Sequence, residues 1–282
     1  MGWFTIMAER PILRAAFGPY PSLDRLRTAE PEDFQLEFAE IKPISRAFAP
    51  MVRDGAFDIS EMALGTALQA LAYGKPLVLL PVAVAARFQE GALLCRVDSA
   101  LSGPEALAGC RIGVRAYSQT TGLWLRGILA ELHGVAVRGV RWVTFEDAHV
   151  AEYVDPPWAE RAPAGADMLA MLRHGELDAV VVGNDVPDHP RLRTVFPDPA
   201  AAAHAFRAAY GFTPVNHIAV VRTELAVDHP EWVRLITGLL PPGGADLRSA
   251  AQVALRFLEA QAMLPRPLDI AEVWAGLPEE VA

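Results

Sequence analysis

From Ile12 onwards, short runs of consecutive apolar residues alternate along the chain with segments in which apolar residues are three or four positions apart. The runs and alternations that predict strands in the first part of the chain cover residues 12–18, 34–41, 57–63 and 76–84. Apolar residues three or four positions apart predict the helices between them, one starting at residue 21 and two covering 43–55 and 65–74. Strands that alternate with helices are typical of an α/β protein with largely parallel sheets.

A second series of elements begins near residue 91. Its predicted strands cover residues 93–97, 111–114, 140–145 and 177–183, and its predicted helices cover 103–109, 123–135, 166–176 and 199–211. The stretch HIAVVRTEL, residues 217–225, then predicts a strand that runs back towards the first series, with the cleft-facing loop TPVNH before it. Residues 229–240 predict a helix packed after that strand.

This order of elements predicts two lobes joined by two crossings of the chain. Residues 1–96 and 217–282 form the first, discontinuous lobe, and residues 97–216 form the second. The space between two lobes is a common place for a small-molecule site. Loops that follow the carboxyl ends of strands line such a site, so polar residues there are the first candidates for function.

The composition narrows the class of protein. A hydrophobic fraction of 52% and a mean hydropathy of +0.21 are high, but much of this comes from alanine, which is also a helix former. No apolar run approaches the roughly 20 residues that cross a bilayer. A net charge of -9 argues against nucleic acid or an anionic membrane as the main partner, and it is compatible with a local basic pocket for a small anion.

The cysteines and the N-terminus bear on location. Cys95 and Cys110 lie in or beside predicted strands without metal-ligand spacing, so reduced thiols are expected. The first residues lack the basic start, long apolar run and cleavage site of a secretory signal. We therefore expect a cytoplasmic protein, and whether it forms a homo-oligomer is left open.

Several stretches carry a resemblance to a known family. FDISEMALG, GALLCRVDSALSGPEALAGCRIGV, YSQTTGLWLRGIL and YGFTPVNHIAVVRTELAVDHPEWV resemble segments of the 4,5-dihydroxyphthalate decarboxylases. That family consists of cytoplasmic enzymes with the type II periplasmic-binding-protein fold. The resemblance runs from about Leu13 to the closing FLEAQAMLPRPLDIAEVW and implies a two-lobed α/β fold of this type with a ligand cleft between the lobes.

The resemblance also implies an activity. It predicts a cofactor-independent carboxy-lyase that removes CO2 from a hydroxylated aromatic dicarboxylic acid such as 4,5-dihydroxyphthalate, so the partner is a small aromatic carboxylate. Where the family commonly carries a basic, histidine-containing loop, this chain has AARFQEG at residues 85–91. Two alternatives stay open because fold alone does not determine chemistry: a solute-binding protein for a small anion, and another lyase or hydrolase on the same scaffold.

Decarboxylation of an electron-rich ring requires donors for carboxylates, a general acid, and a base that acts on a phenol. The segment YSQTTG, residues 117–122, precedes a predicted helix, whose first turn has free N–H groups and the positive end of the dipole. Ser118, Thr120 and Thr121 are therefore candidate substrate-binding residues, with helix capping as the alternative. Arg87 is a candidate carboxylate clamp, and an ion pair with Glu90 is its alternative.

Two residues are candidate acid–base groups. His217 has the right side chain for proton transfer near neutral pH, and it matches the histidine of the family's TPVNH segment. A loop histidine without a chemical role is the alternative. Glu61 serves as a proton donor when protonated or as a base for a ring hydroxyl when ionised, with capping of the next helix as its alternative.

Further candidates for binding the substrate lie beside these groups or at strand ends. Ser60 precedes Glu61, and Asn216 precedes His217. Tyr20 follows the first predicted strand and is placed to stack on an aromatic ring or hydrogen-bond to it. Asn184 follows a strand of the second lobe, where a turn residue is the alternative.

Motifs for other chemistries are absent from the sequence. His149, His189, Asp185 and Glu61 show no HxH, HExxH or comparable spacing, so no metal site is predicted. The chain also lacks a GxGxxG fingerprint, a P-loop and the GxSxG elbow of serine hydrolases.

Overall fold

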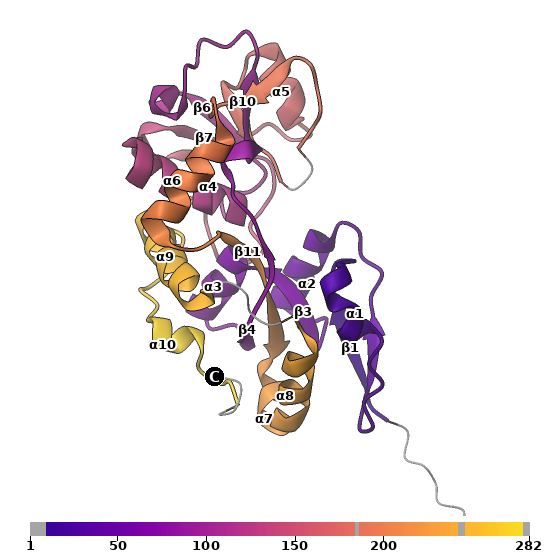
Figure 1. Ribbon diagram of the computed structural model, residues 1–282. Coiled ribbons are helices and arrows are strands. Elements are labelled where there is room, and N and C mark those ends of the chain that lie inside the picture. Colours follow the sequence, from indigo (N-terminus) through magenta and orange to yellow (C-terminus); the bar gives the residue numbers. More distant parts are fainter. Residues whose placement is uncertain (1–9, 184–185, 242–245, 279–282) are drawn as a thin grey trace, which may run out of the picture.

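The computed structural model describes residues 10–183, 186–241 and 246–278 and contains two β-sheets flanked by helices (Figure 1). The first sheet has the order β2-β1-β3-β11-β4, and the second has the order β10-β5-β9-β6-β7-β8. The first contains β1 (Ile12–Ala16), β2 (Gln35–Phe38), β3 (Ile59–Ala63), β4 (Leu77–Ala86) and β11 (Val215–Arg222). The second contains β5 (Leu93–Arg96), β6 (Arg111–Val114), β7 (Arg141–Thr144), β8 (Ala159–Arg161), β9 (Ala179–Val181) and β10 (Leu192–Thr194). The predicted α/β class is confirmed.

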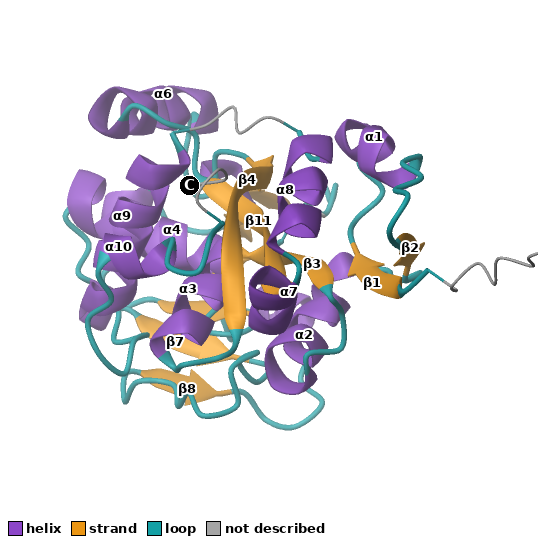
Figure 2. Cartoon of the chain, turned by 90° about the horizontal axis from the view of Figure 1, so that it is seen from below, coloured by secondary structure: helices purple, strands orange, loops and turns teal. Residues whose placement is uncertain are grey.

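The helices lie against the faces of these sheets and between them (Figure 2). The α-helices are α1 (Asp24–Arg27), α2 (Phe48–Asp54), α3 (Leu64–Ala72), α4 (Thr120–His133), α5 (Met168–His174), α6 (Pro199–Tyr210), α7 (Thr223–Asp228), α8 (Pro230–Leu239), α9 (Leu247–Ala260) and α10 (Ile270–Val273). Single 3-10 turns are η1 (Pro21–Leu23), η2 (Ile44–Ala47), η3 (Glu90–Ala92), η4 (Pro104–Leu107) and η5 (Val137–Gly139).

The chain crosses between the sheets twice. It leaves the first sheet after Ala86, builds the second sheet, and returns at Val215 as β11. β1, β2 and β3 are parallel, whereas β11 runs antiparallel to both of its neighbours, β3 and β4. β5 pairs with β9 and β10 and so lies in the second sheet. The residue boundaries proposed above for the lobes, 1–96 with 217–282 and 97–216, stay a prediction.

β3 is buried along its whole length because helices cover both faces of the first sheet. One face packs mainly against α3 and α2, and the other against α1, α7 and α8. Ser60 and Glu61 of β3 are therefore polar groups inside the core, each with no exposed surface. Buried polar groups require hydrogen-bond partners, which makes this strand a place to look for function.

Helix α9 packs against α3, α4 and β4 and so contacts elements on either side of the crossings. Gly127 of α4 allows this close approach, since a Cβ atom added there would lie 2.0 Å from the ring of Phe257. Gln261, just after α9, accepts a hydrogen bond from Arg126 and donates one to the carbonyl of Leu123. α9 was not predicted from the sequence.

One predicted boundary is wrong, and one strand was not predicted. The return strand covers 215–222 rather than 217–225, because Thr223 begins helix α7 and the pairing already starts at Val215. β8 was missed because its three residues are largely exposed and lack a hydrophobic pattern.

Two sequence expectations concern cysteines and membranes. Cys95 is buried, Cys110 is partly buried, and both are free thiols. Within the described ranges, no helix is long and apolar enough to cross a bilayer.

Candidate active site

A cavity of about 690 Å³ lies between the two sheets and is lined from both of them. Such a volume is typical of small-molecule sites. From the first sheet, the lining comes from the segment before α2, the junction of β3 and α3, and the start of β11. From the second sheet, it comes from the segments that follow β6, β7, β8 and β9. The lining residues are Pro43, Ile44, Ser45, Arg46, Phe48, Ala63, Thr66, Arg115, Gln119, Thr120, Thr121, Phe145, Glu146, His149, Ala166, Asp167, Met168, Leu169, Val181, Val182, Gly183, Pro187, Asn216 and His217.

Two consecutive residues of β11, Asn216 and His217, line this cavity. In a regular strand, successive side chains point to opposite faces. Here the register with β4 shifts: Val215 pairs with Ala86 and His217 with Ala85, so β11 has one extra residue at this point. A bulge redirects side chains, which explains how neighbouring residues reach one cavity. The predicted cleft-facing loop is therefore wrong for residues 215–217, which belong to a bulged strand.

The imidazole of His217 is held by a buried carboxylate. His217 pairs with Ala63 of β3, and Glu61 lies two residues earlier, on the same face of that strand. Glu61 Oε1 lies 2.5 Å from His217 Nδ1. The His217 side chain is 13% exposed and the Glu61 side chain 0%, so only the imidazole reaches the cavity. With Nδ1 bound to Glu61, Nε2 is the ring nitrogen left for a ligand.

Two further donors hold the Glu61 carboxylate. The backbone N–H of Gly18 donates to Oε2 over 2.8 Å, and the Tyr20 hydroxyl donates to Oε1 over 2.8 Å. Burial and the charge of Glu61 raise the pKa of Tyr20, so its phenol stays protonated and remains a donor. This set of donors suits an ionised carboxylate, which only accepts hydrogen bonds. The carboxylate then requires a proton on His217 Nδ1, which sets the tautomer of the ring.

Within the part of the chain that the structure describes, the cavity lining does not include Glu61, Tyr20 or Ser60. Ser60 Oγ donates to the Glu61 carbonyl over 2.7 Å and contacts the Ala16 carbonyl over 3.3 Å. Glu61 and Tyr20 thus lie behind His217, and the Ser60 hydroxyl is directed at backbone carbonyls of the sheet. Their predicted contact with a substrate stays a prediction.

The starts of α3 and α4 meet at the cavity. The backbone N–H of Gly65 donates to Thr120 Oγ1 over 3.0 Å, and Arg87 Nη2 donates to Thr121 Oγ1 over 3.2 Å. The first-turn N–H groups of an α-helix have no partner within the helix and carry its positive end. Gln119, the residue at the cap position, makes no side-chain capping bond. Two helix N-termini therefore bring positive potential to one wall of the cavity.

Ser118 is 3% exposed and precedes that cap position without lining the cavity, within the part of the chain that the structure describes. The alternative that Ser118, Thr120 or Thr121 caps the helix is wrong, because the N-cap residue of α4 is Gln119. Asn184 lies outside the described residues.

Arg87 and Asn216 lie on the two segments by which the chain crosses between the sheets, and hydrogen bonds join these segments. The Arg87 backbone N–H donates to the Pro214 carbonyl over 3.0 Å, and the side-chain amides of Gln89 and Asn216 hydrogen-bond to each other. Burial lowers the pKa of Arg87. Glu90 is buried, and its carboxylate has no hydrogen-bond partner among the described residues, so the alternative Arg87–Glu90 ion pair is absent there. Both predicted residues thus have structural contacts at the edge of the cavity.

Sequence reasoning missed other polar residues of the cavity wall. Arg46 stands exposed before α2, and Arg115 follows β6, where its Nη1 donates to Glu146 Oε2 over 3.2 Å. His149 also lines the cavity, although it had been considered only as an unsupported metal ligand. None of these residues belongs to a local motif, because the fold brings them together from separate segments.

His149 differs from His217 in its surroundings. Its Nδ1 lies 3.0 Å from the Thr66 hydroxyl, and its carbonyl accepts a hydrogen bond from Arg53 Nε over 2.9 Å. Burial and the charges of Arg115 and Arg53 lower the pKa of His149 to about 4. The ring is therefore neutral at neutral pH.

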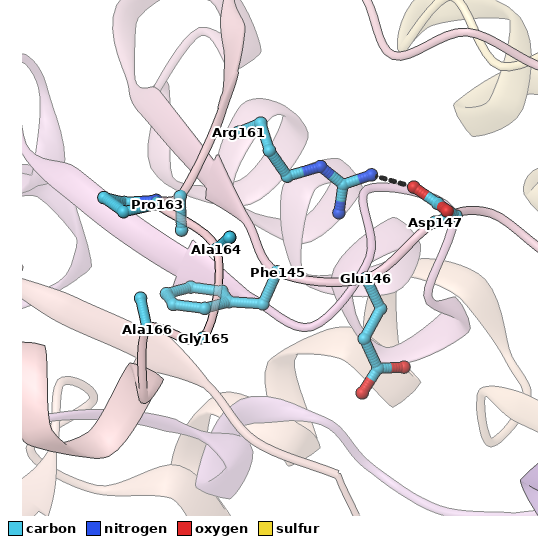
Figure 3. Close-up of a pocket in the computed structure, with 9 residues that line it drawn as sticks. Phe145, Glu146, Asp147, Arg161, Pro163, Ala164, Gly165 and Ala166 are labelled. Atoms are coloured by element: carbon cyan, nitrogen blue, oxygen red, sulfur yellow. Dashed lines mark hydrogen bonds and ion pairs between the residues drawn. The ribbon is translucent and has the colours of Figure 1, made fainter.

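A second pocket of about 480 Å³ adjoins the cavity and shares Phe145, Glu146 and Ala166 with it (Figure 3). Its charged residues already have partners, since Arg161 pairs with Asp147 and Glu146 pairs with Arg115. Among the residues that the structure describes, no group of three or more His, Cys, Asp or Glu side chains could hold a metal ion. We therefore place the candidate site in the larger cavity.

Comparison with known proteins agrees with the resemblance seen in the sequence. No protein-family model matches the chain. The chain is 28% identical, over an alignment of 287 positions including gaps, to a 4,5-dihydroxyphthalate decarboxylase of Comamonas testosteroni, covering 93% of this chain and 86% of that protein. It is 29% identical to a 4,5-dihydroxyphthalate decarboxylase of Pseudomonas putida, covering 57% of this chain and 67% of that protein. These relatives are named as decarboxylases, which are carboxy-lyases, and the predicted resemblance is confirmed.

Solved structures agree on the fold. The chain is similar to the periplasmic aliphatic sulphonate-binding protein SsuA of Escherichia coli, with a TM-score of 0.54, 13% identity, and coverage of 96% of this chain and 84% of that one. It is also similar to a putative periplasmic sulfonate-binding protein of Methylobacillus flagellatus KT, with a TM-score of 0.52, 11% identity, and coverage of 94% and 91%. The predicted type II periplasmic-binding-protein fold is confirmed, and at these identities the likeness concerns the fold alone.

Proposed function

We propose that this protein decarboxylates a hydroxylated aromatic dicarboxylic acid, with 4,5-dihydroxyphthalate as the first candidate substrate. The observation that carries the proposal is the His217–Glu61 pair, in which a buried carboxylate holds an imidazole at the wall of a cavity. Similarity to two 4,5-dihydroxyphthalate decarboxylases supports the same reaction. The predicted location in the cytoplasm belongs to this proposal, and cell fractionation tests it.

The carboxylates of the substrate bind at the positive wall of the cavity. The first turns of α3 and α4 meet there, as the Gly65–Thr120 hydrogen bond indicates. Helix N-termini favour anions through their free N–H groups and dipole. Arg46 lines the same cavity and adds positive charge, whereas Arg115, which also lines it, is paired with Glu146. Two helix ends and Arg46 suit an acid with two neighbouring carboxylates better than one with a single carboxylate.

His217 delivers the proton that replaces CO2. As an imidazolium it holds Nδ1–H against Glu61 and transfers the Nε2 proton to the ring carbon that bears the leaving carboxylate. The bond from that carbon to the carboxylate then breaks, its electron pair restores the aromatic ring, and CO2 departs. His217 is left neutral with its proton on Nδ1, and a solvent proton restores it. The net reaction consumes one proton and yields one CO2.

The ring hydroxyls supply the electron density that this step requires. In 4,5-dihydroxyphthalate, each carboxylate has a hydroxyl on the opposite, para carbon of the ring. Such a hydroxyl donates electrons to the carbon that must be protonated, so we propose that the reaction proceeds without an organic cofactor. Glu61 contributes by stabilising the imidazolium and fixing its orientation, as a positioning residue.

Turnover by the purified protein tests this proposal. Incubation with 4,5-dihydroxyphthalate is expected to release CO2 and 3,4-dihydroxybenzoate in equal amounts, detected by gas analysis and chromatography. Phthalate, which lacks the hydroxyls, is expected to release no CO2 at a comparable rate. Absence of CO2 release from a panel of hydroxylated phthalates and benzoates would refute the proposal.

The likeness to sulphonate-binding proteins supports one second candidate, a protein that binds a small anion without converting it. In that case, aromatic dicarboxylates would raise the melting temperature of the protein without turnover. The two candidates share the positive wall of the cavity and differ in whether His217 transfers a proton.

A further inference from the structure

His149 and His217 reach the same cavity from opposite sheets and flank the start of α3. His217 pairs with Ala63, the residue before α3, and His149 contacts Thr66 in the first turn of α3. Both rings stand edge-on to Phe48, with centroid distances of 5.7 Å for His149 and 5.3 Å for His217. One phenyl ring thus contacts both imidazoles.

The groups behind these rings are different. Glu61 stands behind His217, and its negative charge stabilises a protonated imidazole. Behind His149 stands the neutral hydroxyl of Thr66, and the nearby charges of Arg53 and Arg115 oppose protonation. His217 is therefore suited to carry a proton, and His149 to remain a neutral hydrogen-bonding group.

We propose that His149 recognises a hydroxyl group on the substrate ring and thereby makes the site selective for hydroxylated aromatic acids. In the tautomer that we assign, His149 donates Nδ1–H to Thr66 Oγ1, which lies 3.0 Å away, and its Nε2 atom accepts the hydrogen bond of the hydroxyl. This inference rests on the function proposed above and adds a residue that distinguishes the hydroxylated substrate from phthalate itself.

A hydroxyl suits His149 better than a carboxylate does. A neutral imidazole offers one acceptor, which matches the single proton of a phenol. Carboxylates are served by Arg46 and the helix ends that line the same cavity, which provide charge that a neutral ring lacks. The lowered pKa of His149 agrees with this division, because it keeps the acceptor free of a proton at neutral pH.

Hydrogen bonds from Arg53 hold the backbone around His149 in place, and a residue that determines specificity needs such a fixed position. Arg53 of α2 donates hydrogen bonds to the carbonyls of Ala148 and His149, over 2.7 Å and 2.9 Å. A site that is built around a hydrogen bond to a hydroxyl loses much of its affinity for a ligand without that hydroxyl. Selectivity therefore depends on Nε2 of this one ring.

Binding measurements in a variant with slowed turnover test the inference. In a His217→Asn background, calorimetry gives the Kd of 4,5-dihydroxyphthalate and of phthalate, with and without a change at His149. His149→Asn keeps a polar atom near Nδ1 but removes Nε2, whereas His149→Gln keeps a polar atom near Nε2. His174→Gln, at an exposed histidine of α5, is the matched control.

The expected result is that His149→Asn weakens the binding of 4,5-dihydroxyphthalate by roughly 10- to 100-fold and that of phthalate by less than about threefold. His149→Gln restores part of the loss, and His174→Gln changes neither Kd. Equal weakening for both ligands, or no weakening for either, would overturn the inference.

The same measurements separate this inference from the proposed function. Selective weakening together with absence of CO2 release by the unmodified protein would refute the decarboxylase and leave the role of His149 standing. Turnover without selective weakening would refute the role of His149 alone. Binding of neither ligand, together with absence of CO2 release by the unmodified protein, would refute both.

Discussion

At the scale of the residue, the two cavity histidines differ because of what lies behind each ring. The buried carboxylate of Glu61 is held by hydrogen bonds with Gly18, Tyr20 and His217. Among the residues that the structure describes, Glu61 does not line the cavity. A carboxylate in this position acts through the imidazole that it holds. This is the arrangement in which an acidic residue sets the tautomer and orientation of an acid–base histidine.

Glu61→Gln tests this positioning role. The substitution keeps the shape of the side chain and removes its charge, so the imidazolium form of His217 loses its partner. We expect kcat to fall roughly 100- to 1,000-fold with little change in KM, because the substrate contacts remain. Steady-state kinetics measure both constants.

Tyr20→Phe is the matched control for this change. It removes one donor to Glu61 and leaves the carboxylate and the hydrogen bond to His217 in place. We expect less than about a tenfold loss of kcat. A Glu61→Gln protein that is folded and as active as Tyr20→Phe would contradict the assigned role.

His149 should make the stability of the protein depend on pH. A histidine in an unfolded chain titrates near 6.5, whereas the pKa of folded His149 is lowered to about 4. Between these values the unfolded state binds more protons, so the free energy of unfolding falls as the pH decreases from about 6.5 towards 4. The full effect is on the order of 3 kcal/mol.

Comparison with His149→Asn isolates this effect from the titration of carboxylates. Urea denaturation at pH 7 and pH 4.5 gives the free energy of unfolding of both proteins. The variant should lose less stability on acidification than the unmodified protein, since it lacks the group that unfolding protonates. Equal losses would show that His149 does not have the lowered pKa.

At the scale of the element, close packing of α9 against α4 joins parts of the chain on both sides of the crossings. Gly127→Ala tests this contact. Alanine favours a helix over glycine by about 1 kcal/mol, but its Cβ would lie 2.0 Å from the buried ring of Phe257. Overpacking typically costs about 1–3 kcal/mol, so we expect net destabilisation in urea denaturation.

Gly238→Ala is the matched control, because it lies near the end of α8 and an added Cβ meets nothing within 4 Å. There we expect a gain of up to about 1 kcal/mol in the free energy of unfolding. Equal effects at Gly127 and Gly238 would contradict the close packing of α9 on α4.

Most elements could be predicted from the sequence because their hydrophobic patterns are local. The helix predicted over 43–55 ends at Gly55, whose φ of 57° suits glycine, and the strand predicted over 57–63 is β3. The bulge at Asn216 could not be predicted, since it depends on the register between β11 and β4, which are far apart in the sequence. α9 was missed although its apolar face is buried.

The site could be predicted only where residue type and family resemblance coincided. His217 and Glu61 were both named, but their contact depends on the pairing of β11 with β3. Arg46, Arg115 and His149 carried no local signal, because the cavity gathers them from loops of both sheets.

At the scale of the whole molecule, contacts between the two sheets hold the cavity in its present form. Arg53 binds the carbonyls of Ala148 and His149, and Lys75 pairs with Glu152 over 2.5 Å. These contacts tie α2 and the end of α3 to the loop after β7. They bring His149, from one sheet, opposite His217, from the other.

The central claim is that His217 delivers a proton to the carbon that loses CO2. It is tested most directly by running the reaction with 4,5-dihydroxyphthalate in deuterated water and comparing the unmodified protein with His217→Asn. We expect the unmodified protein to yield 3,4-dihydroxybenzoate with one deuterium on the ring carbon next to the remaining carboxylate, seen by NMR. We expect His217→Asn, folded by circular dichroism, to be slower by roughly 100- to 10,000-fold. Full activity of His217→Asn, or product without deuterium at that carbon, would contradict the account.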